Sequence, residues 1–325
     1  IHPRDEPAGF RGSLREYQKE GLGWLDFLRE FRFGGCLADD MGLGKTVQVL
    51  AMLIKHHQPD CKCELPKAGP SLVVAPKSLI FNWIEEAARF APGLRMLDYT
   101  GTHRRDLLDN LDQYDVVITT YGTLRRDIVE LKDLEFDYAI LDEAQAIKNH
   151  QSQTAKACRL ITAKYRLAMT GTPVENHLGD LWSLFEFLNP GILGSNGFFQ
   201  SLVPRAEASD EETQSLDWLA KGLRPYILRR TKAQVLNDLP EKLEQTLYCD
   251  MEPTQQKMYS ELRDFFRSSL NAKIESDGLN RSKIHVLEAL LRLRQVACHP
   301  GLVDPKKKRD SSAKLDLLVE QIREV

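Results

Sequence analysis

Short runs of apolar, often β-branched residues alternate with amphipathic stretches between Leu14 and Leu188. This alternation is typical of a parallel sheet covered by helices on both faces. Most of the runs are continuously apolar, which suits strands that are buried on both sides. The predicted strands are Gly35 to Ala38, Ser71 to Ala75, Asp115 to Thr119, Tyr138 to Leu141 and Arg166 to Met169. The pattern therefore predicts a three-layer α/β core with a central parallel sheet.

A helix is predicted at the start of this region. Ser13 and Glu16 have the spacing of a capping box, in which each side chain satisfies a free amide at the helix start. The residues that follow place apolar side chains on one face at helical spacing, which predicts a packing surface. These residues are Leu14, Tyr17, Trp24, Leu25 and Leu28.

The second part of the chain has a different pattern. Beyond Asn189-Pro190-Gly191 the strand signal fades, and long helices are predicted at Thr254 to Lys273 and Lys283 to Cys298. A leucine-rich stripe in the second of these helices predicts a packing face. It consists of Val286, Leu287, Leu290, Leu291 and Leu293. This half is therefore expected to be largely helical.

Three shorter segments complete that half. Gln245 to Met251 could form one further strand. The polar stretch Asp304 to Ser312 indicates a flexible connection, and Ala313 to Glu324 a last helix.

Length and charge limit the possibilities further. The 325 residues exceed the ~150 of a typical domain, so one full lobe and a substantial second part are expected. The chain opens with Ile1 and ends inside an expected helix at Val325, which favours a piece of a longer polypeptide. Because the formal net charge is only −3, any hold on nucleic acid has to come from local basic patches.

No apolar run approaches the ~20 residues of a membrane helix, and no signal pattern opens the chain, so we expect an intracellular protein without a membrane partner. The six cysteines are scattered, which fits a reducing compartment. His56 and His57 with Cys61 and Cys63 could hold a metal, but the C-x-C spacing lacks the usual gap and favours a surface loop.

A phosphate-binding loop is indicated where the first expected strand passes into a helix expected over 45–56. Its residues are Asp39, Asp40, Met41, Gly42, Leu43, Gly44, Lys45 and Thr46. The free amides of such a loop and of the helix start attract the β- and γ-phosphates of a nucleotide. Lys45 adds a full charge, and Thr46 places a hydroxyl for Mg²⁺. Asp39 departs from the usual pattern, which has glycine there.

Two acids follow the apolar run Tyr138 to Leu141. A buried parallel strand delivers its last residues to the ligand edge of the sheet, where the phosphate loop is also expected. Asp142 would hold Mg²⁺, and Glu143 is placed to orient and polarise the water that attacks the γ-phosphate. With both motifs in order at strand ends, a chance glycine turn and a solvated acid pair are disfavoured.

At this point the chain resembles the Swi/Snf family of superfamily-two helicase-like ATPases. The resemblance rests on eight segments that span nearly the whole chain. They are 14–21 (LREYQKEG), 39–46 (DDMGLGKT), 74–83 (VAPKSLIFNW), 119–123 (TTYGT), 142–145 (DEAQ), 168–176 (AMTGTPVEN), 228–232 (LRRTK) and 294–300 (RQVACHP).

The resemblance implies a RecA-like ATP-binding lobe whose cofactors are ATP and Mg²⁺. It implies that Gln18 reads the adenine, since an amide offers both a donor and an acceptor. It also implies that Gln145 links the acid pair to a γ-phosphate sensor coupled to lobe movement, formed by Thr170, Gly171 and Thr172.

The resemblance further implies double-stranded DNA as partner. Loop-end hydroxyls, amides and lysines suit contacts to DNA phosphates, which position a protein without reading sequence. The matching residues are Lys77, Ser78, Thr119, Thr120, Lys148 and Asn149. Taken singly, each could equally be an ordinary cap or a solvated side chain. The run Lys306 to Arg309 is more simply a solvated charge run, whereas Arg229 and Arg230 match a family element near the lobe junction.

The family's motor has a second RecA-like lobe, which supplies an arginine to the transition state, and no motif of that lobe occurs in these residues. We therefore expect a tail at 1–13, the ATP-binding lobe at 14–240 with a helical insertion after about 190, and a helical protrusion and linker at 241–325 that ends in the first helix of the second lobe. An arginine finger is worth ~10³ to 10⁵ in turnover, so this chain alone should hydrolyse ATP poorly.

Two other interpretations remain. An RNA-directed helicase of the same superfamily shares the phosphate loop and the acid pair, but the helical part after Pro190 resembles the duplex-DNA translocases that remodel nucleoproteins or displace bound proteins. A non-hydrolysing interaction scaffold would not need the intact residues Lys45, Thr46, Asp142 and Glu143.

Overall fold

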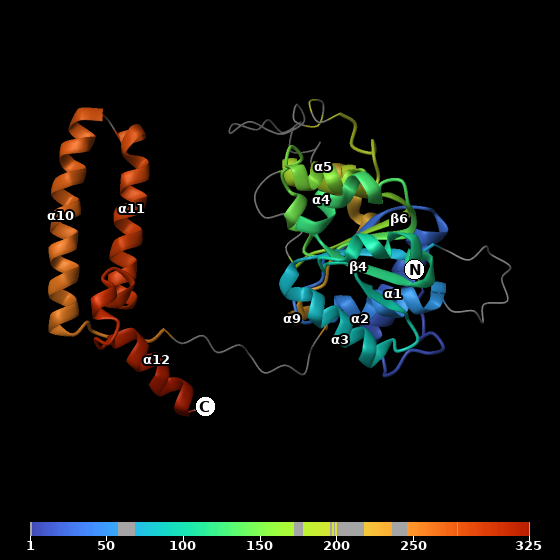
Figure 1. Ribbon diagram of the computed structural model, residues 1–325, viewed down its shortest axis with the longest axis horizontal. Coiled ribbons are helices and arrows are strands. Elements are labelled where there is room, and N and C mark those ends of the chain that lie inside the picture. Colours follow the sequence, from blue (N-terminus) through green and yellow to red (C-terminus); the bar gives the residue numbers. More distant parts are fainter. Residues whose placement is uncertain are drawn as a thin grey trace. The chain divides into compact units, whose positions relative to one another are not determined.

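The computed structural model describes residues 2–57, 69–171, 178–195, 197, 199, 218–235, 246–277 and 279–324. The chain divides into two compact units, Ile1–Leu239 and Pro240–Val325. Figure 1 shows the first unit as a sheet with helices and the second as helices alone. Among the described residues, no helix is both long and apolar enough to cross a membrane.

The first unit is built on a seven-stranded sheet in the order β3-β4-β2-β5-β6-β1-β7. Every pairing between the described strands is parallel. The strands are β1 (Gly35–Leu37), β2 (Ser71–Ala75), β3 (Met96–Asp98), β4 (Val116–Thr120), β5 (Glu135–Leu141), β6 (Thr162–Met169) and β7 (Ile227–Leu228). The α/β fold with a central parallel sheet is therefore confirmed.

Helices cover both faces of this sheet (Figure 1). Alternate strand residues feed two separate apolar clusters, as the two-residue period of a strand requires. Val73 and Ile140 pack with one set of helices, whereas Leu72 and Leu141 pack with the other. The first set is α1 (Glu16–Glu30), α2 (Lys45–His57) and α3 (Ile80–Phe90), and the second is α4 (Tyr121–Leu131), α5 (Gln153–Arg159) and α6 (Leu178–Leu188).

The start of the first helix differs from the prediction. The helix begins at Glu16, and Ser13 does not cap it, because its hydroxyl donates to Glu6 instead. The side chain that reaches back to the helix start belongs to Gln18, whose Oε1 accepts from Arg15 N–H at 2.9 Å. The capping-box prediction from Ser13 and Glu16 was therefore wrong.

All five predicted strands are present, with bounds shifted by up to four residues, and two more pair at the sheet edges. β7 has only two residues, and β3 ends in the exposed Asp98, so neither forms a continuous apolar run like the three fully buried residues of β1. The strand predicted at Gln245 to Met251 is absent from its described residues, 246–251.

The second unit contains the long helices α10 (Pro253–Asp277) and α11 (Leu279–Cys298), followed by α12 (Ala313–Glu324). The described residues of α11 bury Ala289 and Val296. Gln255 on α10 donates to the carbonyl of Val296 at 2.8 Å. The leucine stripe was predicted to pack, yet Leu287, Leu290 and Leu291 are more than half exposed. That prediction was wrong for these three leucines, whereas Val286 and Leu293 of the stripe are half-buried, on the side of α11 that also carries the buried Ala289 and Val296.

The amino end of β1 is fixed by Asn189, which follows α6. Asn189 Oδ1 accepts from Gly34 N–H at 2.8 Å, and its Nδ2 donates to the Gly34 carbonyl at 2.8 Å. Gly34 is buried, and a Cβ there would lie 2.3 Å from the Leu188 carbonyl oxygen. The side-chain amide thus replaces a strand partner at the point where β1 begins.

We expect Asn189→Ala to lower the free energy of unfolding by about 2–4 kcal/mol, because two buried backbone groups lose their partners. Urea denaturation measures this loss. Asn110→Ala is the matched control, since exposed Asn110 only accepts from Gln113. Equal stability of the two variants would contradict the role of Asn189.

Candidate functional site

The predicted phosphate loop is the turn between β1 and α2. Gly42 and Gly44 have φ values of 84° and 76°, in the left-handed region that glycine adopts without a steric cost. The ammonium of Lys45 donates to the carbonyls of Asp39 at 2.7 Å and Asp40 at 3.4 Å. The loop therefore curls around the cation that opens α2, where free helix amides also favour an anion.

Asp39, which stands in place of the usual first glycine, is fully buried. Its carboxylate accepts from the Arg230 side chain and from Gln48. A buried carboxylate is tolerated when it is paired and hydrogen-bonded. The departure from the usual loop pattern is thus matched by a specific partner, which the sequence did not reveal.

Gln18 lies against the phosphate loop. Its Nε2 donates to the Leu43 carbonyl at 3.1 Å, and a Cβ on Gly44 would lie only 2.6 Å from the same nitrogen. The hydroxyl of Tyr17 donates to the same carbonyl at 3.1 Å. The start of α1 is therefore tied directly to the loop, and adenine recognition by Gln18 stays a prediction.

The first acid, Asp142, follows β5 and is buried. Its Oδ2 accepts from Trp83 Nε1 at 2.8 Å, and its Oδ1 accepts from Glu143 N–H at 2.9 Å. Burial raises the pKa of Asp142, while the bond from Trp83 and the charge of Lys45 lower it. A partly desolvated carboxylate near a lysine, with lone pairs to spare, is a suitable ligand for Mg²⁺.

The second acid heads a chain of side-chain hydrogen bonds. Glu143 Oε2 accepts from Gln145 Nε2 at 2.7 Å, and Gln145 Oε1 accepts from Thr170 Oγ1 at 3.1 Å. The backbone N–H of Thr170 donates to the Leu37 carbonyl at the end of β1. This chain joins the acid pair to the strand that carries the phosphate loop.

Glu143 itself has φ 50° and ψ 56°. The left-handed region is unfavourable for a residue with a Cβ and is used mainly where surrounding structure enforces it. Next to Thr170, a Cβ on Gly171 would lie 3.1 Å from Met41 Cγ, so this element touches the phosphate loop. Thr172 lies outside the described residues.

The residues predicted to contact DNA follow the neighbouring strands β2, β4 and β5. Lys77 and Ser78 are exposed in a short 3₁₀ helix (Lys77–Leu79) after β2. Lys148 and Asn149 are exposed after β5. The carboxyl ends of these parallel strands lie at one edge of the sheet.

The two threonines of this set have internal partners. Thr119 is fully buried, and its hydroxyl donates to the Tyr99 carbonyl at 2.9 Å, so the hydroxyl is not available to a phosphate in this structure. Thr120 caps α4 by accepting from Thr123 N–H at 3.1 Å. Asn149 also has an internal partner, since its Oδ1 accepts from Gln151 N–H at 3.0 Å. DNA contact by these six residues stays a prediction.

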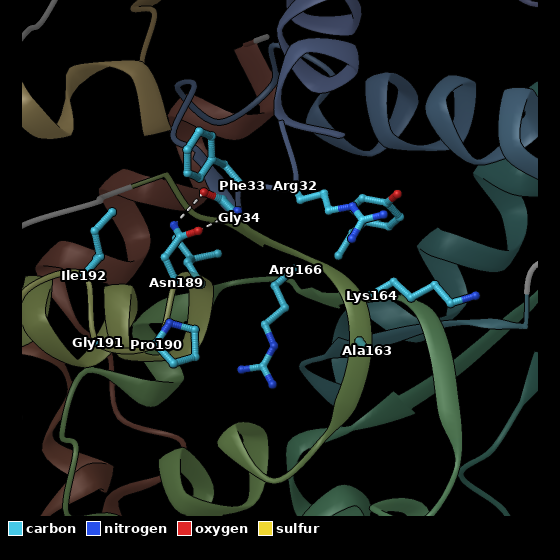
Figure 2. A pocket seen from close by; sticks show the side chains of 12 residues that line it. Arg32, Phe33, Gly34, Ala163, Lys164, Arg166, Asn189, Pro190, Gly191 and Ile192 are labelled. Carbon is cyan, nitrogen blue, oxygen red and sulfur yellow. Dashed lines mark hydrogen bonds between the residues drawn. The ribbon is translucent and has the colours of Figure 1, made fainter. Parts of the chain in front are cut away.

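A separate pocket of about 660 Å³ lies at the opposite, amino end of β1 and β6 (Figure 2). Arg32, Lys164 and Arg166 line it, but Figure 2 shows that Lys164 and Arg166 extend in different directions. The guanidinium of Arg166 donates to the carbonyls of Phe187 and Ile161 and so supports the backbone. This pocket is remote from the phosphate loop along the strands.

The metal site considered at His56, His57, Cys61 and Cys63 lies only partly within the described residues. Within the described ranges, no group of three metal-ligating side chains gathers. His57 instead lies 3.0 Å from the Ser71 hydroxyl, and Cys61 and Cys63 fall outside those ranges.

This chain is similar to known proteins in both sequence and fold. The family described as the SNF2-related domain matches residues 17–302. TATA-binding protein-associated factor MOT1 of Saccharomyces cerevisiae is 37% identical over 316 residues, which are 91% of this chain and 17% of that protein. The putative ATP-dependent helicase/translocase YwqA of Bacillus subtilis is 37% identical over 321 residues, 96% of this chain and 34% of that protein.

The same result comes from solved structures. The SWI2/SNF2 ATPase core of Sulfolobus solfataricus in complex with double-stranded DNA has a TM-score of 0.65 and 38% sequence identity, and the match covers 100% of this chain and 66% of that one. The SWI2/SNF2 ATPase core domain of Sulfolobus solfataricus, a second solved structure, has a TM-score of 0.63 and 38% sequence identity, over 93% of this chain and 62% of that one. The chain thus spans only part of each of these proteins.

Two residues in the site were not given a role by sequence reasoning. Trp83 and Arg230 lie in recognised segments, yet nothing in their spacing shows that they meet Asp142 and Asp39 across 59 and 191 residues. Local periodicity can predict that a side chain is buried, but it does not predict which distant residue that side chain meets. Only the folded sheet brings these pairs together.

We predict that Trp83→Phe shifts the acidic limit of magnesium-dependent ATP binding to higher pH. Losing the indole donor raises the pKa of Asp142 further, and the metal requires the ionised carboxylate, so affinity falls earlier as pH decreases. The expected loss at mildly acidic pH is about tenfold, the scale of one hydrogen bond to a charged group. Titration of fluorescent ATP at several pH values, with and without Mg²⁺, measures it.

Trp218→Phe is the matched control, because Trp218 is 73% exposed and belongs to neither cluster around the site. An unchanged pH midpoint in Trp83→Phe would contradict the assigned role of its indole.

Proposed function

Because this chain belongs to the SNF2-related family, we propose that it is the ATP-binding lobe of a motor that uses ATP hydrolysis to move along double-stranded DNA. The observation that carries the proposal is the convergence of the phosphate loop, the buried Asp142 and the bonded chain from Glu143 to Thr170 at one end of the sheet.

In this proposal Lys45 and the loop amides of Asp40 to Gly44 hold the β- and γ-phosphates. Thr46 and Asp142 would hold Mg²⁺, which supplies charge neutralisation to the phosphates when bound. The residues fit the ion chemically, because a hydroxyl and a carboxylate are oxygen ligands and the Asp142 carboxylate is buried within the electrostatic influence of Lys45. Gln18, whose side-chain amide lies beside Gly44, would bind the adenine.

Glu143 acts on the water that attacks the γ-phosphate. Gln145 fixes one of its carboxylate oxygens, which leaves the other to orient the water and accept its proton. Because Gln145 is also bonded to Thr170, a displacement at the γ-phosphate reaches the Thr170-Gly171 element and the loop residue Met41. We propose this connection as the first step of coupling between hydrolysis and movement.

The DNA-binding surface would lie on the same edge of the sheet, over the ends of β2, β4 and β5. Lysines and amides there contact phosphates without reading bases, so tracking is independent of sequence. A relative solved with double-stranded DNA and relatives described as a translocase and as a TATA-binding protein-associated factor support a motor that displaces or remodels bound proteins.

The second unit, residues 240–325, would serve as the protrusion and linker to a second RecA-like lobe. In that arrangement the arginine that completes the transition state comes from the second lobe. Because this arginine would be supplied by the second lobe, we expect the 325-residue chain to hydrolyse ATP slowly when it is studied alone.

We expect the chain to bind ATP with Mg²⁺ and Lys45→Ala to weaken that binding by at least about tenfold, since one phosphate-paired charge is lost. Steady-state hydrolysis should be slow and nearly unaffected by duplex DNA, because an arginine finger contributes ~10³ to 10⁵. Equilibrium titration and phosphate release measure the two quantities.

Lys156→Ala is the control for this experiment, because Lys156 is exposed on α5 away from the loop. Unaltered ATP affinity in Lys45→Ala would refute the nucleotide site. Strong stimulation of the isolated chain by duplex DNA would refute the requirement for a second lobe.

We also predict that Lys77→Ala and Lys148→Ala each weaken binding to duplex DNA equally on unrelated sequences and lower the salt dependence by about one phosphate contact. Fluorescence anisotropy over a range of salt concentrations measures both effects. Lys132→Ala is the control, because exposed Lys132 lies at the amino side of β5. Preferential binding to structured RNA, or unchanged slopes in both variants, would contradict the proposed surface.

A further inference from the structure

The segment that follows β7 runs along the phosphate loop as an additional support. Ala38 N–H donates to the Leu228 carbonyl at 2.7 Å, and Asp40 N–H donates to the Arg230 carbonyl at 3.0 Å. In the other direction, Lys232 N–H donates to the Asp40 carboxylate at 3.0 Å. Residues 228–232 are thus bonded to Ala38, at the entrance to the loop, and twice to Asp40, although they lie about 190 residues away in the chain.

Arg230 is the centre of this contact. Its side chain is buried, and its Nε donates to Asp39 Oδ1 at 2.9 Å while its backbone N–H donates to the same oxygen at 3.1 Å. Gln48 Oε1, on the helix behind the loop, accepts from Arg230 Nη2 at 2.9 Å. The carboxylate that replaces the usual glycine is therefore held by the backbone and the side chain of Arg230, and by Gln48 Nε2, which donates to its Oδ2 at 3.3 Å.

The same guanidinium also contacts the start of α1. Its Nη1 donates to the Tyr17 carbonyl, and its carbon lies 5.2 Å from the centre of the Tyr17 ring. Tyr17 precedes Gln18, and both side chains donate to the Leu43 carbonyl. Arg230 consequently joins the start of α1 to the phosphate loop by a single rigid, planar group.

The space around this group is filled. A Cβ on Gly21 would lie 1.9 Å from Gln48 Oε1 and 3.0 Å from Arg230 Nη2. A glycine is therefore required in α1 at this position, despite the cost of glycine inside a helix, because the polar network occupies the space. The packing leaves Arg230 little freedom, which is the condition for a positioning group.

We propose that Arg230 is a positioning residue of the ATP site that sets the distance between the adenine side, at Tyr17 and Gln18, and the phosphate loop, at Asp39. This inference rests on the proposed function. If the start of α1 and the phosphate loop are already held at the right separation, less conformational entropy is lost when a whole nucleotide binds. A ligand that has phosphates but no base contacts only the phosphate loop, so its affinity depends less on that separation.

The test compares ATP with inorganic tripolyphosphate, both with Mg²⁺, by isothermal titration on the 325-residue chain. In Arg230→Lys the charge opposite Asp39 is retained, but a single ammonium cannot reproduce the planar fork that also bonds Tyr17 and Gln48. We expect ATP affinity to fall by about tenfold and tripolyphosphate affinity by no more than about threefold. Arg224→Gln, an exposed arginine in the turn before β7, is the control and should leave both affinities unchanged.

A second variant separates positioning from folding. The double variant Asp39→Asn with Arg230→Gln removes both buried charges together, which avoids an unpaired charge and preserves the fold better than either single change. We expect its thermal midpoint to stay near that of the unchanged chain while the preference for ATP over tripolyphosphate is still lost.

The outcomes are distinguishable. If the unchanged chain does not bind ATP, the proposed function fails. If it binds ATP, and the folded double variant or Arg230→Lys binds ATP within about twofold of it, only the role of Arg230 fails. Equal losses for ATP and tripolyphosphate would likewise overturn the role, because Arg230 would then hold the loop without relating it to the adenine side.

Discussion

Neighbouring parallel strands bring their carboxyl ends to one edge of a sheet, and each candidate group in this chain depends on that constraint. β1 pairs with β6, and β6 pairs with β5, so the phosphate loop and the acid pair lie two strand spacings apart, or about 10 Å. A nucleotide triphosphate with its metal can bridge such a gap. The intervening β6 ends at Met169, which places Thr170 between the two motifs.

The second physical theme is the burial of charge at that edge. Asp39 and Asp142 are both nearly inaccessible to water, but their carboxylates have different hydrogen-bond partners. Asp39 forms an ion pair with Arg230 and accepts a hydrogen bond from Gln48, so its negative charge is compensated within the protein. Asp142 receives only neutral N–H donors, from Trp83 and from the backbone of Glu143, and burial keeps its pKa raised. The energetic cost of this incompletely compensated carboxylate is reasonable where a cation is to be bound.

Much of the framework could be predicted because it depends on local patterns. Continuous apolar runs identified five of the seven strands, and the glycine-lysine-threonine sequence located the loop and the start of α2. The errors occurred where long-range contacts decide the outcome. Ser13 bonds Glu6 instead of capping α1, and Leu287, Leu290 and Leu291 of α11 are left exposed. The pairs Trp83–Asp142 and Arg230–Asp39 could not be predicted either, because no periodicity encodes contacts between distant segments.

The account is tested most directly by a crystal structure of this chain with Mn²⁺, as a visible substitute for Mg²⁺, and a non-hydrolysable ATP analogue. The anomalous signal of the metal should lie between the hydroxyl of Thr46 and the carboxylate of Asp142, with the γ-phosphate next to Lys45. A metal remote from Asp142, or a nucleotide seated in the pocket beside Arg166, would contradict the account.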